Sequence, residues 1–348
     1  MQTHKKRGLS GMKYTLRDIA KRANVSPATV SNALNGRAGV SKAVQENILS
    51  IALEMGYQLN RESAKTSRHV RLIVFRSHGM VVMDTQFFSE LIESIQLECH
   101  KMGLELLISH VTARKDMDYI NQVNAFRNEE CAGIILLGTE MDEEELKLYM
   151  NFRSPMVVLD NLFRLENVHS VVMNNWQAGY LAAEALYAAG HRDIQHITSS
   201  IGFNNMTDRR LGVTAGLNKF GLSLREDQIW PVRPTMNGAY EDMKALLQSG
   251  KKLPEAFFAA NDIMAIGCMR AIREAGYRIP EDVSMIGMDD TSICLACTPQ
   301  LSTVHVFRRE LGQAVVRTLF SLPEGKNNCF LKTEVGVELV MRDSVKTK

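Results

Sequence analysis

Residues 15–36 read T-L-R-D-I-A-K-R-A-N-V-S-P-A-T-V-S-N-A-L-N-G, and this stretch decides how the amino-terminal part of the chain folds. Its apolar residues first recur at the i, i+3, i+4, i+7 spacing of one helical face, and Asn24 then tolerates the left-handed backbone of a tight turn. Ser26 is a good N-cap, and Pro27 suits the first position of a new helix. The pattern predicts two short helices joined by a tight turn, which is a helix-turn-helix.

The predicted second helix carries side chains that suit DNA. In a helix-turn-helix this helix lies in the major groove and presents its amino-terminal half to the base edges. Asn32 can bond adenine through two hydrogen bonds, and Ala28 is small enough to contact a thymine methyl group. The hydroxyls of Thr29 and Ser31 suit phosphates. A three-helix bundle without a DNA partner is the alternative, because a third helix is predicted over residues 41–56.

The charge of the chain is divided unevenly along its length. The 348 residues together carry +2 at neutral pH, but residues 1–69 carry +8 and the remainder carries −6. Such asymmetry indicates a basic head that meets a polyanion, although a solvated basic surface without a partner would also produce it.

From residue 71 onward, short apolar runs alternate with helical patterns. This alternation predicts parallel sheets covered by helices, and the stretch is too long for one such sheet, so we expect two doubly wound lobes. Strands are expected at residues 72–75, 104–109, 133–137, 156–159, 170–173, 194–198, 256–260 and 283–288, and helices at 86–102, 176–189, 208–220, 240–248 and 262–275.

Polar residues at the ends of these strands are candidates for a ligand site. Ligands of such folds bind outside the carboxyl ends of the strands, which here means between the two lobes. Asp160, Asn261 and Asp289 each end an apolar run, and Arg209 lies near the start of a helix. Carboxylate, amide and guanidinium groups together can satisfy a ligand with many hydroxyls. Helix capping is the alternative for a strand-end aspartate, and for Asp262 both interpretations are equally good.

The sequence holds no recognisable catalytic motif. The phosphate loop G-x-x-x-x-G-K-[ST], the nucleophile elbow G-x-S-x-G and the zinc motif H-E-x-x-H are all missing. Cys294 and Cys297 form a C-x-x-C without a second cysteine pair, so we expect no metal and no cofactor. No apolar run approaches the roughly 20 residues that span a bilayer, and none follows the basic amino terminus as in a secretory signal. We therefore expect a cytoplasmic protein without a membrane partner.

Residues 15–36 resemble the DNA-binding headpiece of the LacI/GalR (lactose/galactose repressor) family, most clearly in A-T-V-S and L-N-G. The segments N-N-W-Q-A-G-Y, A-N-D-I-M-A-I-G and I-P-E-D-V-S-M-I-G-M-D-D follow in family order and extend the resemblance to about residues 14–344. The resemblance implies an all-α helix-turn-helix headpiece followed by an α/β domain of two lobes, similar to periplasmic binding proteins, with two doubly wound parallel sheets. It also implies a sequence-specific transcriptional regulator, not an enzyme, that acts as a homodimer on pseudo-palindromic operator DNA.

The resemblance assigns roles to individual residues of the head. Base-reading positions of the family fall on Pro27, Ala28 and Asn32, and because a proline side chain cannot hydrogen-bond a base, Asn32 is expected to carry more of the readout. Thr66 stands where the family inserts a leucine wedge into the minor groove, and threonine is a poor wedge. The expected DNA-binding residues are Thr15, Ser26, Pro27, Ala28, Thr29, Ser31, Asn32, Asn35, Tyr57, Asn60, Arg61 and Lys65.

The resemblance also implies a small-molecule effector between the lobes. Pro234 occupies a position that is often aromatic in the family, and the loop after the first strand also departs from the family pattern. The expected effector-binding residues are Ser77, Phe88, Asp160, Phe203, Asn205, Arg209, Asn261 and Asp289.

The expected function is a repressor of carbohydrate-utilisation genes whose operator affinity changes when a sugar or sugar derivative binds. A nucleobase or nucleoside effector and a phosphoprotein corepressor are alternatives within this class. A soluble sugar-binding protein would require a signal peptide and no helix-turn-helix, and a sugar kinase would require the phosphate loop.

The expected domain boundaries follow from these patterns. Residues 1–11 form a basic extension, either an arm or the product of an upstream start codon; residues 12–58 form the DNA-binding domain, and residues 59–70 form a hinge. The first lobe is expected to comprise residues 71–161 and 305–330, and the second lobe residues 162–304 and 331–348.

Overall fold

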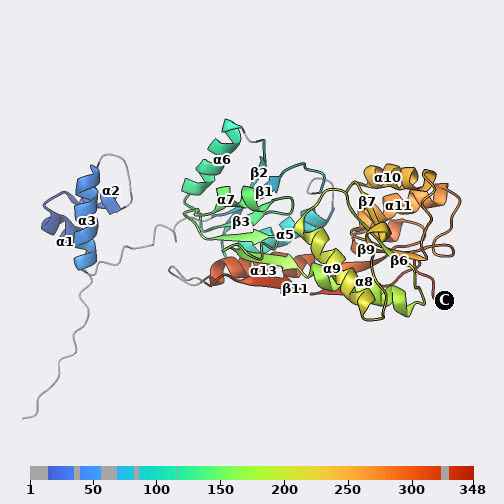
Figure 1. Ribbon diagram of the computed structural model, residues 1–348. Coiled ribbons are helices and arrows are strands. Elements are labelled where there is room, and N and C mark those ends of the chain that lie inside the picture. Colours follow the sequence, from blue (N-terminus) through green and yellow to red (C-terminus); the bar gives the residue numbers. More distant parts are fainter. Residues whose placement is uncertain (1–14, 35–39, 56–68, 82–85, 115, 323–328) are drawn as a thin grey trace, which may run out of the picture. The chain divides into compact units, whose positions relative to one another are not determined.

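The computed structural model describes residues 15–34, 40–55, 69–81, 86–114, 116–322 and 329–348 (Figure 1). The chain forms two compact units, Met1–Thr66 and Ser67–Lys348. The extension 1–11 and most of the expected hinge lie outside the described residues. Within the described part, no helix combines the length and the apolar character needed to cross a membrane.

The smaller unit is a three-helix head. Its helices are α1 (Leu16–Ala23), α2 (Pro27–Leu34) and α3 (Lys42–Glu54). The predicted turn is confirmed, since Asn24 caps α1 in the left-handed conformation with φ 53°. The apolar faces predicted from the sequence meet in one core of buried residues: Ile19, Ala20, Val30, Ala33, Ile48 and Ala52.

The larger unit contains two six-stranded sheets, one in each lobe (Figure 1). The first sheet has the order β11-β5-β4-β3-β1-β2 and the second has the order β12-β10-β9-β8-β6-β7. All strand pairs are parallel except β10 with β12. The strands are β1 (His69–Arg76), β2 (Glu105–Thr112), β3 (Gly133–Leu137), β4 (Met156–Leu159), β5 (His169–Met173), β6 (Ile194–Ser199), β7 (Ile229–Val232), β8 (Ala256–Ala259), β9 (Ser284–Asp289), β10 (Ser302–Val306), β11 (Lys332–Val335) and β12 (Val337–Val340).

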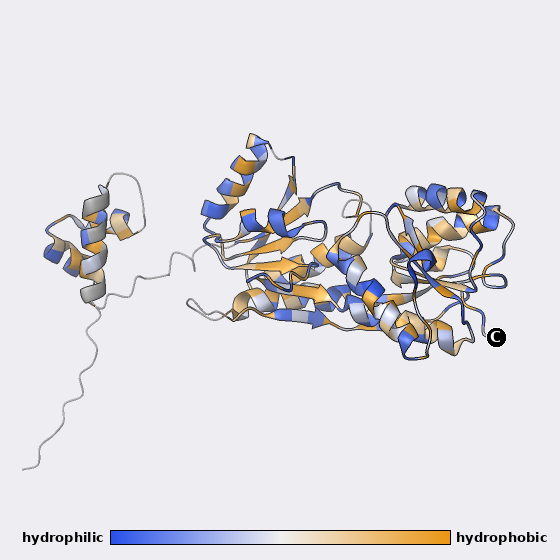
Figure 2. Cartoon of the chain, in the orientation of Figure 1, coloured by the Kyte–Doolittle hydropathy of each residue, from blue (hydrophilic) through white to orange (hydrophobic). Residues whose placement is uncertain are grey.

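Helices cover the sheets, so the strands are apolar on both faces (Figure 2). In β1, for example, Leu72 and Val74 enter one hydrophobic core, whereas Ile73 and Phe75 enter another. The helices are α5 (Gln86–Lys101), α6 (Met117–Asn128), α7 (Glu143–Tyr149), α8 (Asn175–Ala188), α9 (Asn204–Asn218), η1 (Glu226–Gln228), α10 (Met236–Gln248), α11 (Asp262–Glu274), α12 (Ile293–Ala296) and α13 (Arg308–Ser321).

The expected lobe boundaries at residues 161/162 and 330/331 are wrong. Strand β5 was assigned to the second lobe but pairs with β4 of the first sheet, with His169 opposite Val157. Strand β11 likewise pairs with β5, with Lys332 opposite Ser170. The chain therefore crosses between the lobes after β5, between β10 and α13, and between β11 and β12. An apolar run predicts a strand but does not say which of two sheets the strand joins.

Candidate functional site

The exposed face of α2 carries the predicted base-reading residues. Val30 and Ala33 are buried in the core of the head, while Pro27 and Ala28 are exposed and Asn32 is half-buried. The residues expected to read bases are therefore not part of the buried core of the head. This geometry leaves the amino-terminal half of α2 available to the major groove.

The starts of α1 and α2 are fixed by local hydrogen bonds. The Thr29 backbone N–H donates to Ser26 Oγ over 3.0 Å, and the two hydroxyls lie 2.8 Å apart. The Thr15 backbone N–H and hydroxyl each donate to Asp18 over 2.7 Å. Thr15, Ser26 and Thr29 therefore have capping roles, which are compatible with the phosphate contacts expected of them, because helix amino termini attract anions. Five further expected DNA contacts lie outside the described residues: Asn35, Tyr57, Asn60, Arg61 and Lys65.

Two of the candidate effector residues are strand-end aspartates with unusual backbone geometry. Asp160 follows β4 with φ 60°, and Asp289 ends β9 with φ 115°. Residues with a side chain rarely adopt positive φ, and each such conformation costs about 1–3 kcal/mol. Such strain concentrates at functional sites, where the surrounding structure holds it in place.

Asp160 is bonded across the two lobes. Its Oδ2 accepts the Thr139 hydroxyl over 2.7 Å, and its Oδ1 accepts the side-chain amide of Asn205 on α9 over 3.1 Å. Burial raises the pKa of Asp160 to about 6, against the opposing effects of Thr139, Arg209 and Asn205. The expected pair Asp160 and Asn205 is therefore brought together in the structure, each residue from a different lobe.

Arg209 lies one helical turn beyond Asn205 and is buried. Its Nε donates to Asn175 Oδ1 over 2.8 Å, and its Nη1 donates to the carbonyl of Ala260. Burial lowers the pKa of Arg209, whereas the carboxylates of Asp289, Asp160 and Asp262 oppose that shift. The guanidinium is thus held rigidly within electrostatic reach of three carboxylates from three strand ends.

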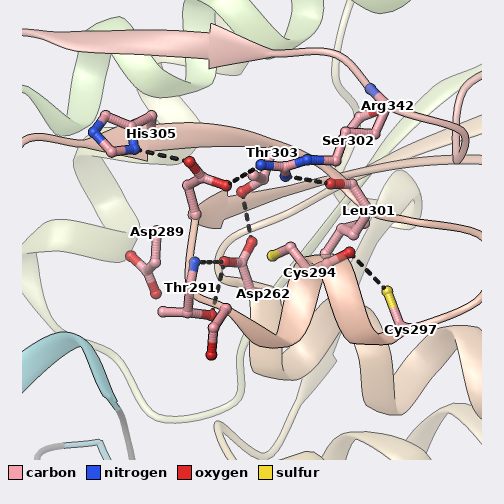
Figure 3. A network of polar contacts seen from close by, with 12 residues as sticks. Asp262, Asp289, Thr291, Cys294, Cys297, Leu301, Ser302, Thr303, His305 and Arg342 are labelled. Carbon is pink, nitrogen blue, oxygen red and sulfur yellow. Dashed lines mark hydrogen bonds and ion pairs between the residues drawn. The ribbon is translucent and has the colours of Figure 1, made fainter.

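At the start of α11 the capping residue is Asn261, not Asp262. Asn261 is the N-cap, and its Oδ1 accepts the Met264 N–H over 2.8 Å. Asp262 is fully buried and accepts the Thr303 hydroxyl over 2.6 Å and the Thr291 N–H over 3.0 Å (Figure 3). Asp262 therefore anchors the chain that follows β9.

Asp289 differs from these neighbours because its carboxyl group accepts no hydrogen bond from the part of the chain that the structure describes. It is half-buried, and burial raises its pKa to about 8 despite the nearby Arg209. The next residue, Asp290, is held by His305 Nδ1 at 2.8 Å and by Arg342 Nη2 at 2.6 Å (Figure 3). The loop is therefore fixed while the Asp289 carboxyl stays available to a ligand.

The remaining three candidates have mainly structural contacts. The Ser77 hydroxyl donates to the carbonyl of Glu140 over 3.2 Å. Phe88 is buried in the hydrophobic core, edge-to-face with Phe87 at 5.1 Å, which does not support its expected role as a lining residue. Phe203 precedes α9, is half-buried and packs against two hydrophobic cores.

Sequence reasoning missed Glu140, which is buried beneath the loop after β1. Its carboxylate accepts the backbone N–H groups of Ser77, His78, Gly79 and Val81 over 2.8–3.1 Å. Burial raises its pKa, but these N–H groups and His78 hold the pKa below its ordinary value. Glu140 lies in a short turn without periodicity, so no sequence pattern marked it.

Asn161 and Asn204 form a second bridge between the lobes that the sequence did not indicate. The Asn204 amide donates to Asn161 Oδ1 over 2.8 Å. The Asn161 amide in turn donates to the carbonyls of Gly138 and Met141, each over 2.8 Å. Asn161 follows Asp160 and Asn204 precedes Asn205 in the sequence, and this adjacency to two expected effector-binding residues is the only sequence feature that could have indicated them.

Comparison with known proteins places these features in a family. Residues 15–60 match the family described as bacterial regulatory proteins, lacI family, and residues 183–345 match a periplasmic binding protein-like domain. The HTH-type transcriptional repressor PurR of Pasteurella multocida (strain Pm70) is 30% identical over 340 residues, which cover 96% of this chain and 99% of the relative.

Solved structures agree in fold. The complex of the transcriptional regulator CelR with cellobiose is 23% identical, with a TM-score of 0.71 over 95% of this chain and 100% of that chain. The lac repressor dimer bound to operator and the anti-inducer ONPF is 24% identical, with a TM-score of 0.69 over 96% of this chain and 100% of that chain. The chain belongs to the lacI family of bacterial regulatory proteins and is a DNA-binding transcriptional repressor with a ligand-binding domain, not an enzyme.

Proposed function

We propose that the effector is a small polar molecule, a sugar or sugar derivative, which binds between the two lobes and changes the affinity of the repressor for its operator. The observation that carries this proposal is that Asp160 at the end of β4 and Asp289 at the end of β9 both lie within electrostatic reach of Arg209 on α9. Two of these residues adopt strained backbone conformations. Paired charged and amide groups can satisfy adjacent hydroxyls of a polyhydroxylated ligand.

The proposed binding residues at this site are Asp160, Asn205, Arg209 and Asp289, with Asn261 and Phe203 at its margin. The Asp289 carboxyl is the group best able to accept ligand hydroxyls, because Asp160 already accepts Thr139 and Asn205. A ligand changes operator affinity only through its different affinity for the two states of the repressor. The target genes are proposed to serve carbohydrate utilisation.

On the DNA side, a homodimer would present two copies of α2 to a pseudo-palindromic operator in the cytoplasm. Asn32 and Ala28 would contact bases, and the start of α2 would contact phosphates. The capped, exposed amino-terminal half of α2 supports this assignment.

A nucleobase or nucleoside is the second candidate effector, because the curated relative at 30% identity carries the name PurR. A nucleobase presents ring nitrogens and exocyclic groups that Asp289 and Asn205 could equally bond. A phosphoprotein corepressor is the third candidate, and it would act on an outer surface instead of on this site.

The test is an operator gel shift with the full-length protein at about 0.15 M salt, because nonspecific affinity depends strongly on salt. The panel contains mono- and disaccharides, sugar phosphates, nucleobases and nucleosides. We expect one sugar class to change the operator affinity. A response to nucleobases alone would replace the sugar assignment, and a response only to an added phosphoprotein would move the effector away from the lobes.

A further inference from the structure

A closed ring of hydrogen bonds joins the first lobe to residues 289–292, the loop that carries Asp289. Ser292 donates to Gln86 Oε1 through its hydroxyl over 2.5 Å and through its backbone N–H over 3.2 Å. The Gln86 amide donates to Glu90 Oε1 over 2.7 Å. Arg308 Nε donates to Glu90 Oε2 over 2.5 Å, and its Nη1 returns to the loop by donating to the carbonyl of Asp289.

The ring is anchored in both lobes. In the second lobe, the loop is anchored by the bonds of Asp262 to Thr291 and of Asp290 to Arg342 (Figure 3). In the first lobe, Gln86 and Glu90 lie one turn apart on α5, and Arg308 starts α13. These two helices are fastened together, because the Ser94 hydroxyl donates to the carbonyl of Arg309 over 2.7 Å. All bonds of the ring can therefore form together only when the two lobes have the relative position seen in this structure.

The ring requires an arginine at position 308, and a lysine could not make the same set of bonds. Its planar guanidinium presents N–H groups in a fixed fork, so one side chain can bond Glu90 and the carbonyls of Asp289 and Asp290 together. The Arg308 side chain is only 12% exposed, whereas that of Glu90 is 36% exposed. The fork is thus largely shielded from water where it holds the backbone of Asp289.

We propose that Arg308 is a positioning residue for the effector response, and that with Glu90 and Gln86 it couples closure of the lobes to the placement of the Asp289 carboxyl. This inference rests on the proposed effector site, since Asp289 is its ligand-binding group. Separation of the lobes would break the bonds between Ser292 and Gln86. Displacement of the Asp289 backbone would break its bond with Arg308 in the same ring. Bonds that exist in only one arrangement bias the equilibrium between arrangements.

The first arm of the experiment needs neither effector nor operator. Hydrogen exchange of the full-length protein is followed at the Ser292 amide, which donates into the ring. Arg308→Met should accelerate this exchange at least tenfold, and Arg308→Lys should accelerate it less, because one nitrogen replaces only part of the fork. Arg309→Met is the matched control, since Arg309 is the exposed neighbour on the same helix, and it should leave the exchange unchanged.

The second arm uses whichever ligand the operator gel shift identifies. Arg308→Met should raise the half-maximal effector concentration at least fivefold, and the double charge swap Glu90→Arg with Arg308→Glu should not restore it, because glutamate cannot donate to the Asp289 carbonyl. Restoration by the swap would overturn the proposal in favour of a plain ion pair.

Unchanged Ser292 exchange in Arg308→Met, or an equal effect of Arg309→Met, would overturn it without any effector. A panel with no active ligand would instead count against the proposed function.

Discussion

Asn32 is the side chain of α2 whose chemistry best suits base recognition, because its carboxamide both donates and accepts. It is half-buried on a helix whose Val30 and Ala33 face the core, so its direction is fixed by the packing of the head. Arg209 is similarly fixed, by Asn175 and by the carbonyl of Ala260. At the residue scale, the roles proposed for Asn32 and Arg209 therefore depend on polar groups that packed neighbours hold in place.

Asn32→Ala should relax base preference at one position of each half-site. We expect the loss in operator affinity to be about 1–3 kcal/mol, because a paired contact to one base is removed. Binding-site selection on wild type and variant measures the preference directly. An identical profile for both proteins would remove Asn32 from base readout.

Arg209→Ala should abolish the effector response and spare operator binding. The guanidinium lies among the carboxylates of Asp160 and Asp289, whereas the head is a separate compact unit. Arg210→Ala is the control, since Arg210 is the next residue and forms a surface ion pair with Glu226 at 3.3 Å. If Arg209→Ala still responded to the effector at wild-type concentrations, Arg209 would lie outside the site.

At the element scale, α9 is set by its close approach to α8. A Cβ on Gly212 would lie 1.9 Å from the carbonyl oxygen of Trp176, and a Cβ on Gly179 would lie 2.1 Å from that of Arg209. Only glycine allows backbones to come this close. Because α9 carries Asn205 and Arg209, this packing sets the positions of both side chains.

Gly212→Ala should therefore destabilise the larger unit by about 1–3 kcal/mol and weaken the effector response. Denaturant unfolding measures the first effect and the operator gel shift measures the second. Gly202→Ala is the control, since nothing lies within 4 Å of its added Cβ. Equal stability of the two variants would contradict the close packing of α8 and α9.

The helices and strands of the structure agree only in part with those predicted from the sequence. Strands β3 and β4 have the predicted bounds, because their apolar runs end abruptly. Strands β7, β10, β11 and β12 and helices α6, α7, α12 and α13 are not among the predicted elements. β7 contains a proline and the other three strands contain polar residues, so none of the four is a continuous apolar run. The pairing of β5 and β11 depends on contacts far apart in sequence, which no local pattern encodes.

Part of the candidate site could be predicted from the sequence. Asp160, Asn205, Arg209 and Asp289 were each marked by a strand end or a family motif, and the structure brings them together. Glu140 and Arg308 carry no such mark, because their partners are backbone groups of other segments. Their roles exist only in the folded chain.

At the scale of the whole molecule, buried carboxyls link stability to pH. Burial raises the pKa of Asp289 to about 8 and those of Asp160 and Asp262 to about 6. A carboxyl with a raised pKa in the folded chain stabilises the fold when protonated, and this stability is lost as pH rises through the folded-state value.

Relative to Asp289→Asn, which cannot ionise, the wild type should therefore lose Tm as pH rises from about 4, the ordinary pKa of an aspartate, to about 8, and the difference should stay constant above pH 8. The pKa of His196 is lowered by burial to about 4, so this histidine also changes stability within the window, but it does so in both proteins and cancels in the comparison. Scanning fluorimetry at a series of pH values measures both proteins. Parallel curves for wild type and variant would show that Asp289 is not the titrating group.

At the largest scale, we propose that two copies of this chain read one operator together through their heads. Selection from a random double-stranded DNA library with the full-length protein at about 0.15 M salt tests it most directly. We expect enrichment of one pseudo-palindrome with two related half-sites. Recovery of no enriched sequence, or of a single half-site without a symmetric partner, would contradict it.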